Sequence, residues 1–461
     1  MARFYALTTG WCPECRELIP AGLTEEDGCI LLDKMCPVHG SEKVLISRDV
    51  RRYKAYFNHI RPGVRPKYRF TSDFKGCPDS CGLCPQHRQH TCLPIAEITS
   101  RCDLACPVCL KPREAVFEMS PEEFRESLLK LRSYEESLIL LNLSGGEPTL
   151  HPRFSEFIDI SAELGVAQLT VSTNGLRLLK DKALRDLFIK NRVVAALQFD
   201  GLTEATYETL RGRNLLQTKK EIIRIFEQED LPYSLVTVAA RGVSEREIPQ
   251  VADYFFKSKA LSLMIQPAAV SGRAQDNFSP DLRLTIDEVV NNLETSKFIK
   301  PGDLAPIACS HPGCAASAYY FKVRDGEFLS LMEFLGLEEY LRVTANRSFP
   351  GLEPEGHQII LDKIYDRWSA LSPSQEDKVL MSRIRSFLKR LEGQDFSPNR
   401  AFEAGRESVK SVFVHGLMDP YSFDLARLVK CCNHYLQAGG RLVPMCAQNL
   451  SLSAGKSSET L

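Results

Sequence analysis

The sequence lacks the features that mark a membrane-spanning, secreted or nucleic-acid-binding protein. Its 58 basic and 59 acidic side chains give a net charge of -1, so no overall field favours nucleic acid or an anionic membrane surface. No apolar run reaches the roughly 20 residues that cross a bilayer, and residues 1–6 open no signal-peptide pattern. We therefore expect a soluble, cytoplasmic protein without a transmembrane segment and without nucleic acid as its partner.

Cysteine, in contrast, is abundant and clustered. The chain has 461 residues, which is too long for one ordinary core and predicts two or three domains, and 16 of these residues are cysteines. Thiols stay reduced in the cytosol, so tight cysteine clusters in a large intracellular chain indicate metal sites before disulfides. A secreted disulfide-bonded protein is the alternative, and the missing signal-peptide pattern argues against it.

The central cluster consists of Cys102, Cys106 and Cys109, spaced C-x3-C-x2-C. Three such thiolates can bind three irons of a [4Fe–4S] cluster and leave the fourth iron without a protein ligand. An open iron can bind and reduce a small molecule. We therefore assign the catalytic role to these three cysteines.

Three further motifs follow in order, each near the end of an apolar run: Ser144-Gly-Gly-Glu-Pro-Thr149, Ser172-Thr-Asn-Gly175 and Phe199-Asp-Gly201. With the cysteine motif, this order resembles the radical S-adenosylmethionine (radical SAM) superfamily. The resemblance implies that a reduced [4Fe–4S] cluster cleaves SAM to methionine and a 5′-deoxyadenosyl radical. Glu147 suits fixing its own loop as well as it suits touching SAM. The residues expected to bind SAM are Ser144, Gly145, Gly146, Glu147, Ser172 and Asn174.

The fold class is expected to be α/β, because residues 93–300 alternate between strand and helix patterns typical of parallel β/α units. A capping box at Ser120-Pro-Glu-Glu123 predicts a helix to about Arg132. By resemblance the fold is a partial (β/α)6 radical SAM barrel, in which functional residues lie at the C-terminal ends of strands. The six predicted strands are 93–99, 138–143, 168–172, 193–199, 234–239 and 261–266.

An N-terminal metal knuckle is predicted from two short motifs, Cys12-Pro-Glu-Cys15 and Cys36-Pro-Val-His39. Cys12, Cys15 and Cys36 can bind one iron or zinc ion in a zinc-ribbon or rubredoxin-like arrangement. The fourth ligand is either Cys29 or His39. The metal knuckle is expected to have a structural role or to relay electrons.

Two auxiliary [4Fe–4S] clusters are expected from the remaining cysteines. A second C-x3-C-x2-C motif has a nearby fourth cysteine that can close its cluster, and this set is Cys77, Cys81, Cys84 and Cys92. The other set combines distant segments, with either Cys431 or Cys432 as a ligand, and we assign Cys309, Cys314, Cys432 and Cys446.

A charged helix is expected over 375–391. The expected regions are a metal knuckle at 1–45, a connector with the auxiliary motif at 46–92, the barrel at 93–300, a C-terminal auxiliary-cluster and substrate region at 301–448 and a disordered tail at 449–461.

The full cysteine layout, over about residues 10–448, narrows the resemblance. The motifs CPxC and CPxHG, CPxxCGLCPxHxQHTC, CSHPxC and MDxYxFDxxRxxxCCxHY are similar to those of the archaeal tetraether lipid synthases and of the class D radical SAM methylases that act on a methanopterin precursor. This resemblance implies a methyltransferase-like enzyme that abstracts hydrogen from an unactivated C–H position and forms a C–C bond. A reductant such as ferredoxin or flavodoxin is the implied partner.

The substrate stays open between lipid chain coupling and addition of a one-carbon unit to a pterin or other small acceptor. An apolar channel would favour lipid, whereas a polar pocket would favour pterin. Residues 110–114 and Met445 depart from the family pattern on the substrate side. The alternative is a radical SAM maturase that acts on a peptide or tRNA and uses the extra clusters for substrate binding or electron transfer; a basic face on residues 48–69 would support tRNA.

Overall fold

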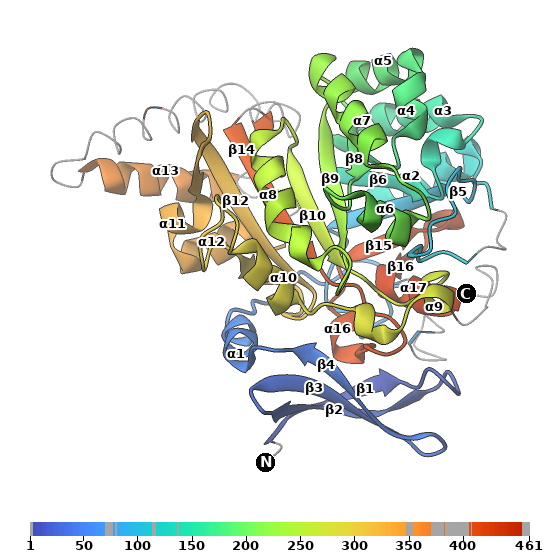
Figure 1. The fold of residues 1–461 in the computed structure, drawn as a ribbon, viewed down its shortest axis with the longest axis vertical. Coiled ribbons are helices and arrows are strands. Elements are labelled where there is room, and N and C mark those ends of the chain that lie inside the picture. Colours follow the sequence, from blue (N-terminus) through green and yellow to red (C-terminus); the bar gives the residue numbers. More distant parts are fainter. Residues whose placement is uncertain are drawn as a thin grey trace.

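The computed structural model describes residues 3–69, 77–78, 81–112, 117–135, 138–346, 354–369, 382, 405–406 and 408–453. Two β-sheets organise this part of the chain (Figure 1). The helix predicted over 375–391 lies outside the described residues except for residue 382. No helix in the described ranges is long and apolar enough to cross a membrane.

The first sheet is an antiparallel meander at the N-terminus. Its neighbouring strands are β1 (Arg3–Trp11), β2 (Leu18–Glu26), β3 (Cys29–Cys36) and β4 (Gly40–Ser47). Ile30 and Leu32 alternate along β3 and are fully buried, where they pack with Tyr53 of α1 (Val50–Asn58). This sheet therefore has a small core of its own.

The second sheet contains six parallel strands in chain order. They are β5 (Leu93–Thr99), β6 (Leu140–Gly145), β7 (Gln168–Thr173), β8 (Val194–Gln198), β9 (Tyr233–Ala239) and β10 (Ser262–Pro267). Each predicted strand overlaps one of these, and the α/β radical SAM fold is confirmed. The largest hydrophobic core lies between these strands and the helices outside them.

Helices connect the parallel strands and cover their outer face (Figure 1). The Ser120 hydroxyl accepts from the Glu123 backbone N–H at 3.1 Å and the Glu123 carboxylate accepts from the Ser120 N–H at 2.8 Å, so the predicted capping box is present. These helices are α2 (Pro121–Tyr134), α3 (Phe154–Glu163), α4 (Leu176–Lys180), α5 (Lys182–Lys190), α6 (Glu204–Arg211), α7 (Leu216–Gln228) and α8 (Ile248–Lys257), with short 3-10 turns at Pro148–Leu150 and Glu245–Glu247.

The C-terminal region extends the barrel sheet at both of its edges. β14 (Val409–His415) pairs in parallel with β10, and β15 (Asn433–Leu436) pairs in parallel with β5. Segments at opposite ends of the barrel region are therefore bound to one continuous C-terminal part of the chain. Between β10 and residue 300 lie α9 (Ala274–Asn277), a 3-10 turn at Pro280–Leu282 and α10 (Ile286–Leu293). The other elements of the C-terminal region are β11 (Ala305–Pro306), β12 (Ala315–Arg324), β13 (Glu327–Ser330), α11 (Leu331–Leu335), α12 (Leu337–Thr344), α13 (Pro354–Ser369), α16 (Leu425–Leu428), β16 (Leu442–Pro444) and α17 (Met445–Ser453), with a 3-10 turn at Ala438–Gly440.

The end of the chain differs from the expected disordered tail. Residues 449–453 belong to α17, in which Asn449 and Leu450 are buried, and Leu450 packs with Phe423 and Val443. Apolar residues before the Ser/Gly-rich stretch thus continue the fold for one more turn. Residues 454–461 lie outside the described residues.

The N-terminal sheet docks on the loop that follows β14. The Lys34 ammonium is buried and donates to the carbonyl oxygens of Trp11 at 3.1 Å and Tyr421 at 2.8 Å. The Trp11 ring packs edge-on against Phe423, with ring centroids 6.3 Å apart. The metal knuckle beside Trp11 is therefore held against the C-terminal region.

Candidate active site and metal centres

A cavity of about 1680 Å³ occupies the interior of the partial barrel and reaches the C-terminal region. Alternate residues of all six parallel strands line it, because successive side chains of a strand point to opposite faces. Apolar side chains such as Ile95, Val236 and Met264 lie among polar ones. The polar lining residues on these strands are Glu97, Thr99, Asn142, Ser144, Gln168, Thr170, Ser172, Thr173, Gln198, Ser234, Ser262 and Gln266.

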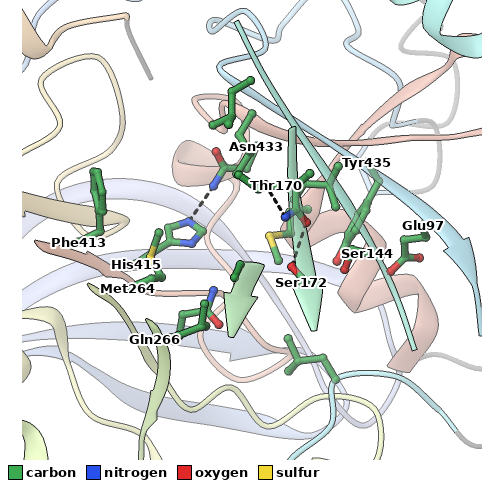
Figure 2. Close-up of a pocket in the computed structure, with 18 of the residues that line it drawn as sticks. Glu97, Ser144, Thr170, Ser172, Met264, Gln266, Phe413, His415, Asn433 and Tyr435 are labelled. Carbon is green, nitrogen blue, oxygen red and sulfur yellow. Dashed lines mark hydrogen bonds between the residues drawn. The ribbon is translucent and has the colours of Figure 1, made fainter. Parts of the chain in front are cut away.

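Hydrogen bonds order several of these side chains (Figure 2). The Asn142 amide donates to Thr170 Oγ1 at 2.8 Å, and Ser172 Oγ donates to Asn142 Oδ1 at 3.0 Å. The Asn433 amide lies 3.3 Å from His415 Nε2. Burial lowers the pKa of His415 to about 4. The Asn433 amide nitrogen can only donate, so His415 Nε2 accepts this hydrogen bond. Sequence reasoning named Ser172 but missed Asn142 and Thr170, although a polar residue at every second position of an apolar strand is a signal for an inward face.

The three cysteines of the central motif all line the cavity, in the loop that follows β5. The segment after β10 fixes this loop. The Ala274 N–H donates to the Cys109 carbonyl at 3.3 Å, and a Cβ added to Gly272, which has a φ of +57°, would lie 2.2 Å from the Leu110 carbonyl oxygen. Three thiols from one short loop, open to a cavity, fit a [4Fe–4S] cluster with one open iron. When bound, this cluster supplies the electron that cleaves SAM.

The glycines of the Ser144–Thr149 motif pack directly on the start of the cysteine loop. Gly145 has a φ of +138°, and a Cβ there would lie 2.1 Å from the Thr99 carbonyl oxygen. The Gly146 N–H donates to this same oxygen at 2.8 Å. Any larger residue would separate the two loops. Five of the six residues expected to bind SAM line the cavity: Ser144, Gly145, Gly146, Ser172 and Asn174.

Glu147, the sixth, is buried and fixes its own loop. Its carboxylate accepts from Thr149 Oγ1 at 2.6 Å, from Thr173 Oγ1 at 2.8 Å and from the Asn174 N–H at 2.7 Å. Burial raises the pKa of Glu147 although these hydrogen bonds act in the opposite direction. It therefore ties the Ser144–Thr149 motif to the Ser172–Gly175 motif.

The Phe199–Gly201 motif positions an arginine beside the cysteine loop. Asp200 is fully buried and accepts from Nε and Nη2 of Arg211, each at 2.7 Å, and Arg211 also interacts with the Cys106 side chain. Burial disfavours the charge on Arg211, but the attraction to Asp200 raises its pKa. Sequence reasoning found the motif without assigning this ion pair, because Arg211 lies one helix further along the chain.

The N-terminal knuckle brings Cys12, Cys15, Cys36 and His39 together, with their ligand atoms within 4.8 Å of one another. His39 Nδ1 lies 3.5 Å from both the Cys12 and the Cys36 sulfur, and the Cys15 and Cys36 sulfurs are 3.8 Å apart. Tetrahedral zinc with Zn–S bonds of about 2.3 Å places its sulfurs about 3.8 Å apart. Backbone hydrogen bonds of His39 and Val38 lower the pKa of Cys36 to about 6, which favours the thiolate that a metal binds. These residues fit one zinc ion.

Cys29, the other proposed fourth ligand, is not part of this group. It begins β3, whereas Cys36 ends that strand. At about 3.3 Å a residue, the two lie about 23 Å apart along the strand. The structure therefore resolves the alternative in favour of His39.

Cys92 lies with thiols of the C-terminal region. Its side chain interacts with those of Cys309 and Cys432, and its N–H donates to the Cys432 carbonyl at 2.9 Å. The cause is the pairing of β5 with β15, since Cys92 and Cys432 directly precede these strands. The sequence predicts that Cys92 completes the set of Cys77, Cys81 and Cys84, whereas the strand pairing places it beside Cys309 and Cys432. Which thiols bind iron stays a prediction.

The other two groups are local to different parts of the fold. The Cys77 and Cys81 sulfurs lie 3.8 Å apart, and Cys84 interacts with Cys77. Arg427 Nε donates to the Cys314 sulfur at 3.5 Å, and the thiols of Cys314 and Cys446 together raise the pKa of the buried Arg427. Cys431 lies in the same environment as Cys314 and Cys446, and burial raises its pKa. Four thiols of the C-terminal region line the cavity, namely Cys314, Cys431, Cys432 and Cys446.

Two family models match the chain. Residues 96–255 match the radical SAM superfamily, and residues 4–48 match the HMPTM N-terminal zinc ribbon domain. The chain is 28% identical over 481 aligned residues to the 7,8-dihydro-6-hydroxymethylpterin dimethyltransferase of Methanocaldococcus jannaschii, covering 96% of this chain and 93% of that protein. It is 30% identical to the PqqA peptide cyclase of Methylorubrum extorquens, covering 46% of this chain and 55% of the relative.

Solved structures match over part of the chain. SuiB of Streptococcus suis bound to the precursor peptide SuiA aligns with a TM-score of 0.40 and 14% identity, covering 45% of this chain and 46% of SuiB. The enzyme anSMEcpe with bound AdoMet and a Cp18Cys peptide aligns with a TM-score of 0.35 and 15% identity, covering 68% of this chain and 95% of that protein. The fold, the three-cysteine loop at the cavity and the matching family model agree: the chain is a radical SAM enzyme whose radical SAM domain spans residues 96–255 and follows a zinc ribbon at residues 4–48.

Proposed function

We propose that this enzyme passes a hydrogen atom from an unactivated C–H position to the 5′-deoxyadenosyl radical and forms a C–C bond that adds a one-carbon unit, supplied by a separate one-carbon donor, to a pterin-like acceptor. The observation that carries the proposal is the polar inner face of the barrel. All six parallel strands contribute hydrogen-bonding side chains to the cavity. The similarity to a pterin dimethyltransferase over almost the whole chain supports the same acceptor class.

A lipid acyl chain is a poorer fit to this inner face. Gln198 Oε1 is buried and has no hydrogen-bond partner among the described residues. A hydrocarbon chain in the cavity would leave this and neighbouring polar atoms unpaired, which is costly in the absence of water. A flat heterocycle with ring nitrogens and carbonyl groups can satisfy them. The apolar lining residues would contact its faces.

The residues of the chain divide the work at the proposed site. Ser144, Ser172 and Asn174 are placed to hold the polar groups of SAM, and the close packing at Gly145 keeps their loop against the cysteine loop. Arg211, held by Asp200, supplies a fixed positive charge at the cavity wall. These groups orient the reactants and need no rearrangement during the reaction.

We also propose two auxiliary [4Fe–4S] clusters beside the one that binds SAM. The thiol groups around Cys77 and around Cys309 supply their ligands, and the second group takes Cys92 from the start of β5. Without metal, neighbouring thiols would have to stay neutral or, as thiolates, would repel one another. Iron binds each thiolate and so stabilises the close arrangement. Their expected role is electron transfer or substrate binding.

Mass analysis of cells that produce the protein tests the proposed function. Pterins heavier by one-carbon units are expected in cells with the wild type and not in cells with Cys106→Ala, which lacks a ligand of the SAM cluster. Lipids lighter by the hydrogens lost in chain coupling would instead identify a lipid-joining enzyme. No change in either pool would favour a peptide or RNA substrate.

A further inference from the structure

A charged pair lies on the cavity wall beside the cysteine loop. Glu97 of β5 and Lys111 of the cysteine loop form an ion pair. The Lys111 ammonium lies 4.8 Å from the centroid of the Tyr435 ring, which holds it by a cation–π contact. All three residues line the cavity, and Figure 2 shows Glu97, Tyr435 and Ser144 on one side of it.

The pair lies beside residues that we assign to the cluster and to SAM. Glu97 is the register partner of Ser144 in the pairing of β5 with β6. The Lys111 N–H donates to the Cys109 sulfur at 3.5 Å. A group bound by this pair would therefore lie beside the place where the radical forms, as a substrate must.

The backbone around Lys111 is fixed. The Lys111 carbonyl accepts from the Arg273 N–H at 3.4 Å and from Arg273 Nε at 3.3 Å. The backbone from which the Lys111 side chain extends is therefore fixed. It belongs to the segment 110–114, whose sequence departs from the family pattern. Such a residue suits recognition of one particular substrate.

The hydrogen-bonding capacity of the pair is largely unused. The side chains of Glu97 and Lys111 are only 21% and 23% exposed. Apart from their contact with each other, Glu97 Oε1 and Lys111 Nζ are buried without a hydrogen-bond partner among the residues that the structure describes. An ammonium carries three protons, so a buried one with a single anionic partner leaves donors unpaired. Such groups are costly to bury, and their position on a cavity wall points to a polar ligand.

We propose that Glu97 and Lys111 recognise the 2-amino-4-oxopyrimidine edge of the acceptor. This edge presents two adjacent N–H donors followed by a carbonyl acceptor. A carboxylate can accept from both donors, and a neighbouring ammonium can donate to the carbonyl oxygen, so the pair matches the edge group by group. The proposal rests on the proposed function, because it names the part of a pterin-like acceptor that these residues hold.

Pterins and guanine nucleotides share this edge, and the test distinguishes them. Binding of 6-hydroxymethylpterin, of lumazine and of GTP to the anaerobically reconstituted full-length protein is measured at equilibrium. Lumazine carries a carbonyl group where pterin carries the 2-amino group. Iron content and circular dichroism establish that each variant folds and binds its clusters.

Glu97→Gln places an amide donor where the edge needs an acceptor, and it should weaken 6-hydroxymethylpterin binding by roughly 10- to 100-fold. Lys111→Met should weaken it by about tenfold and serves as the test if Glu97→Gln does not fold. Lumazine binding should respond less to Glu97→Gln. The matched control is Glu126→Gln, which removes one charge from an exposed pair with Lys130 and should bind as the wild type does.

Each outcome decides between the two proposals. Unchanged pterin affinity in both variants, with a wild type that binds pterin, overturns the edge assignment and leaves the proposed function standing. Binding of GTP but not pterin, lost in Glu97→Gln, supports the edge assignment and overturns the pterin acceptor. A wild type that binds neither overturns both.

Discussion

Replacing Asp200 by asparagine should destabilise the barrel, because it leaves a buried arginine without its counter-charge. Asp200 has no exposed surface, and the Arg211 side chain is 12% exposed. The two hydrogen bonds between them are both 2.7 Å long, so the pair has the bidentate geometry that makes such contacts strong. Breaking a buried pair by removing one partner costs about 3–5 kcal/mol.

This cost can be converted into a change in melting temperature. Unfolding entropy of about 2.1 cal/mol/K per residue amounts to about 1 kcal/mol/K for the whole chain. If the chain unfolds as one unit, Tm falls by about 3–5 °C, and it falls further if the barrel unfolds separately. Anaerobic scanning calorimetry of the cluster-loaded protein measures this shift.

A matched variant separates burial from the loss of a charge. Asp186→Asn makes the same chemical change in the pair with Lys182, whose side chains are 57% and 70% exposed. Exposed pairs of this kind contribute about 0–1 kcal/mol, so its Tm should stay within about 1 °C of the wild type. Equal Tm values for the two variants would refute the reasoning from the buried pair.

Three further outcomes are expected. His39→Ala should lose the zinc ion, measured as metal per chain, whereas Cys29→Ser should keep it; the reverse pattern would contradict the ligand set read from the knuckle. Cys92→Ala and Cys309→Ala should each remove the same auxiliary cluster, so that acid-labile sulfide falls from about 12 to about 8 per chain in both, and unequal losses would show that the two thiols serve different clusters. Burial lowers the pKa of Lys410 to about 7 from an ordinary 10.5, so between these pH values the unfolded chain binds more protons than the folded one. The stability that this group contributes should therefore rise with pH from about 7 to 10.5. Lys410→Met should lack that rise in Tm scans at pH 7, 8 and 9.

Local patterns of the sequence predicted the elements that local physics builds. The alternation of strand and helix patterns over 93–300 predicted the six parallel strands, because short strands separated by amphipathic helices are the pattern of parallel β/α units. The capping box at Ser120 predicted the start of α2, because its two hydrogen bonds join residues that are only three positions apart in the sequence. The ordered motifs placed the cysteine loop and the Ser144–Thr149 loop at strand ends.

Contacts between distant segments could not be predicted from the sequence. The neighbour of Cys92 is set by the pairing of β5 with β15, and nothing near Cys92 encodes which strand occupies that edge. The choice of His39 over Cys29 depends on the length of β3, which separates two cysteines that look close in the sequence. Glu97 and Lys111 likewise meet only because the cysteine loop folds back over β5.

The central claim is radical cleavage of SAM at the loop of Cys102, Cys106 and Cys109, and the most direct test is the formation of 5′-deoxyadenosine. Reconstituted wild type, supplied anaerobically with SAM and a reductant, should form 5′-deoxyadenosine. Cys106→Ala should form none, and Cys81→Ala, altered outside this loop, should still bind SAM. Equal SAM binding and cleavage in the wild type and Cys106→Ala would contradict the assignment of this loop as the active centre.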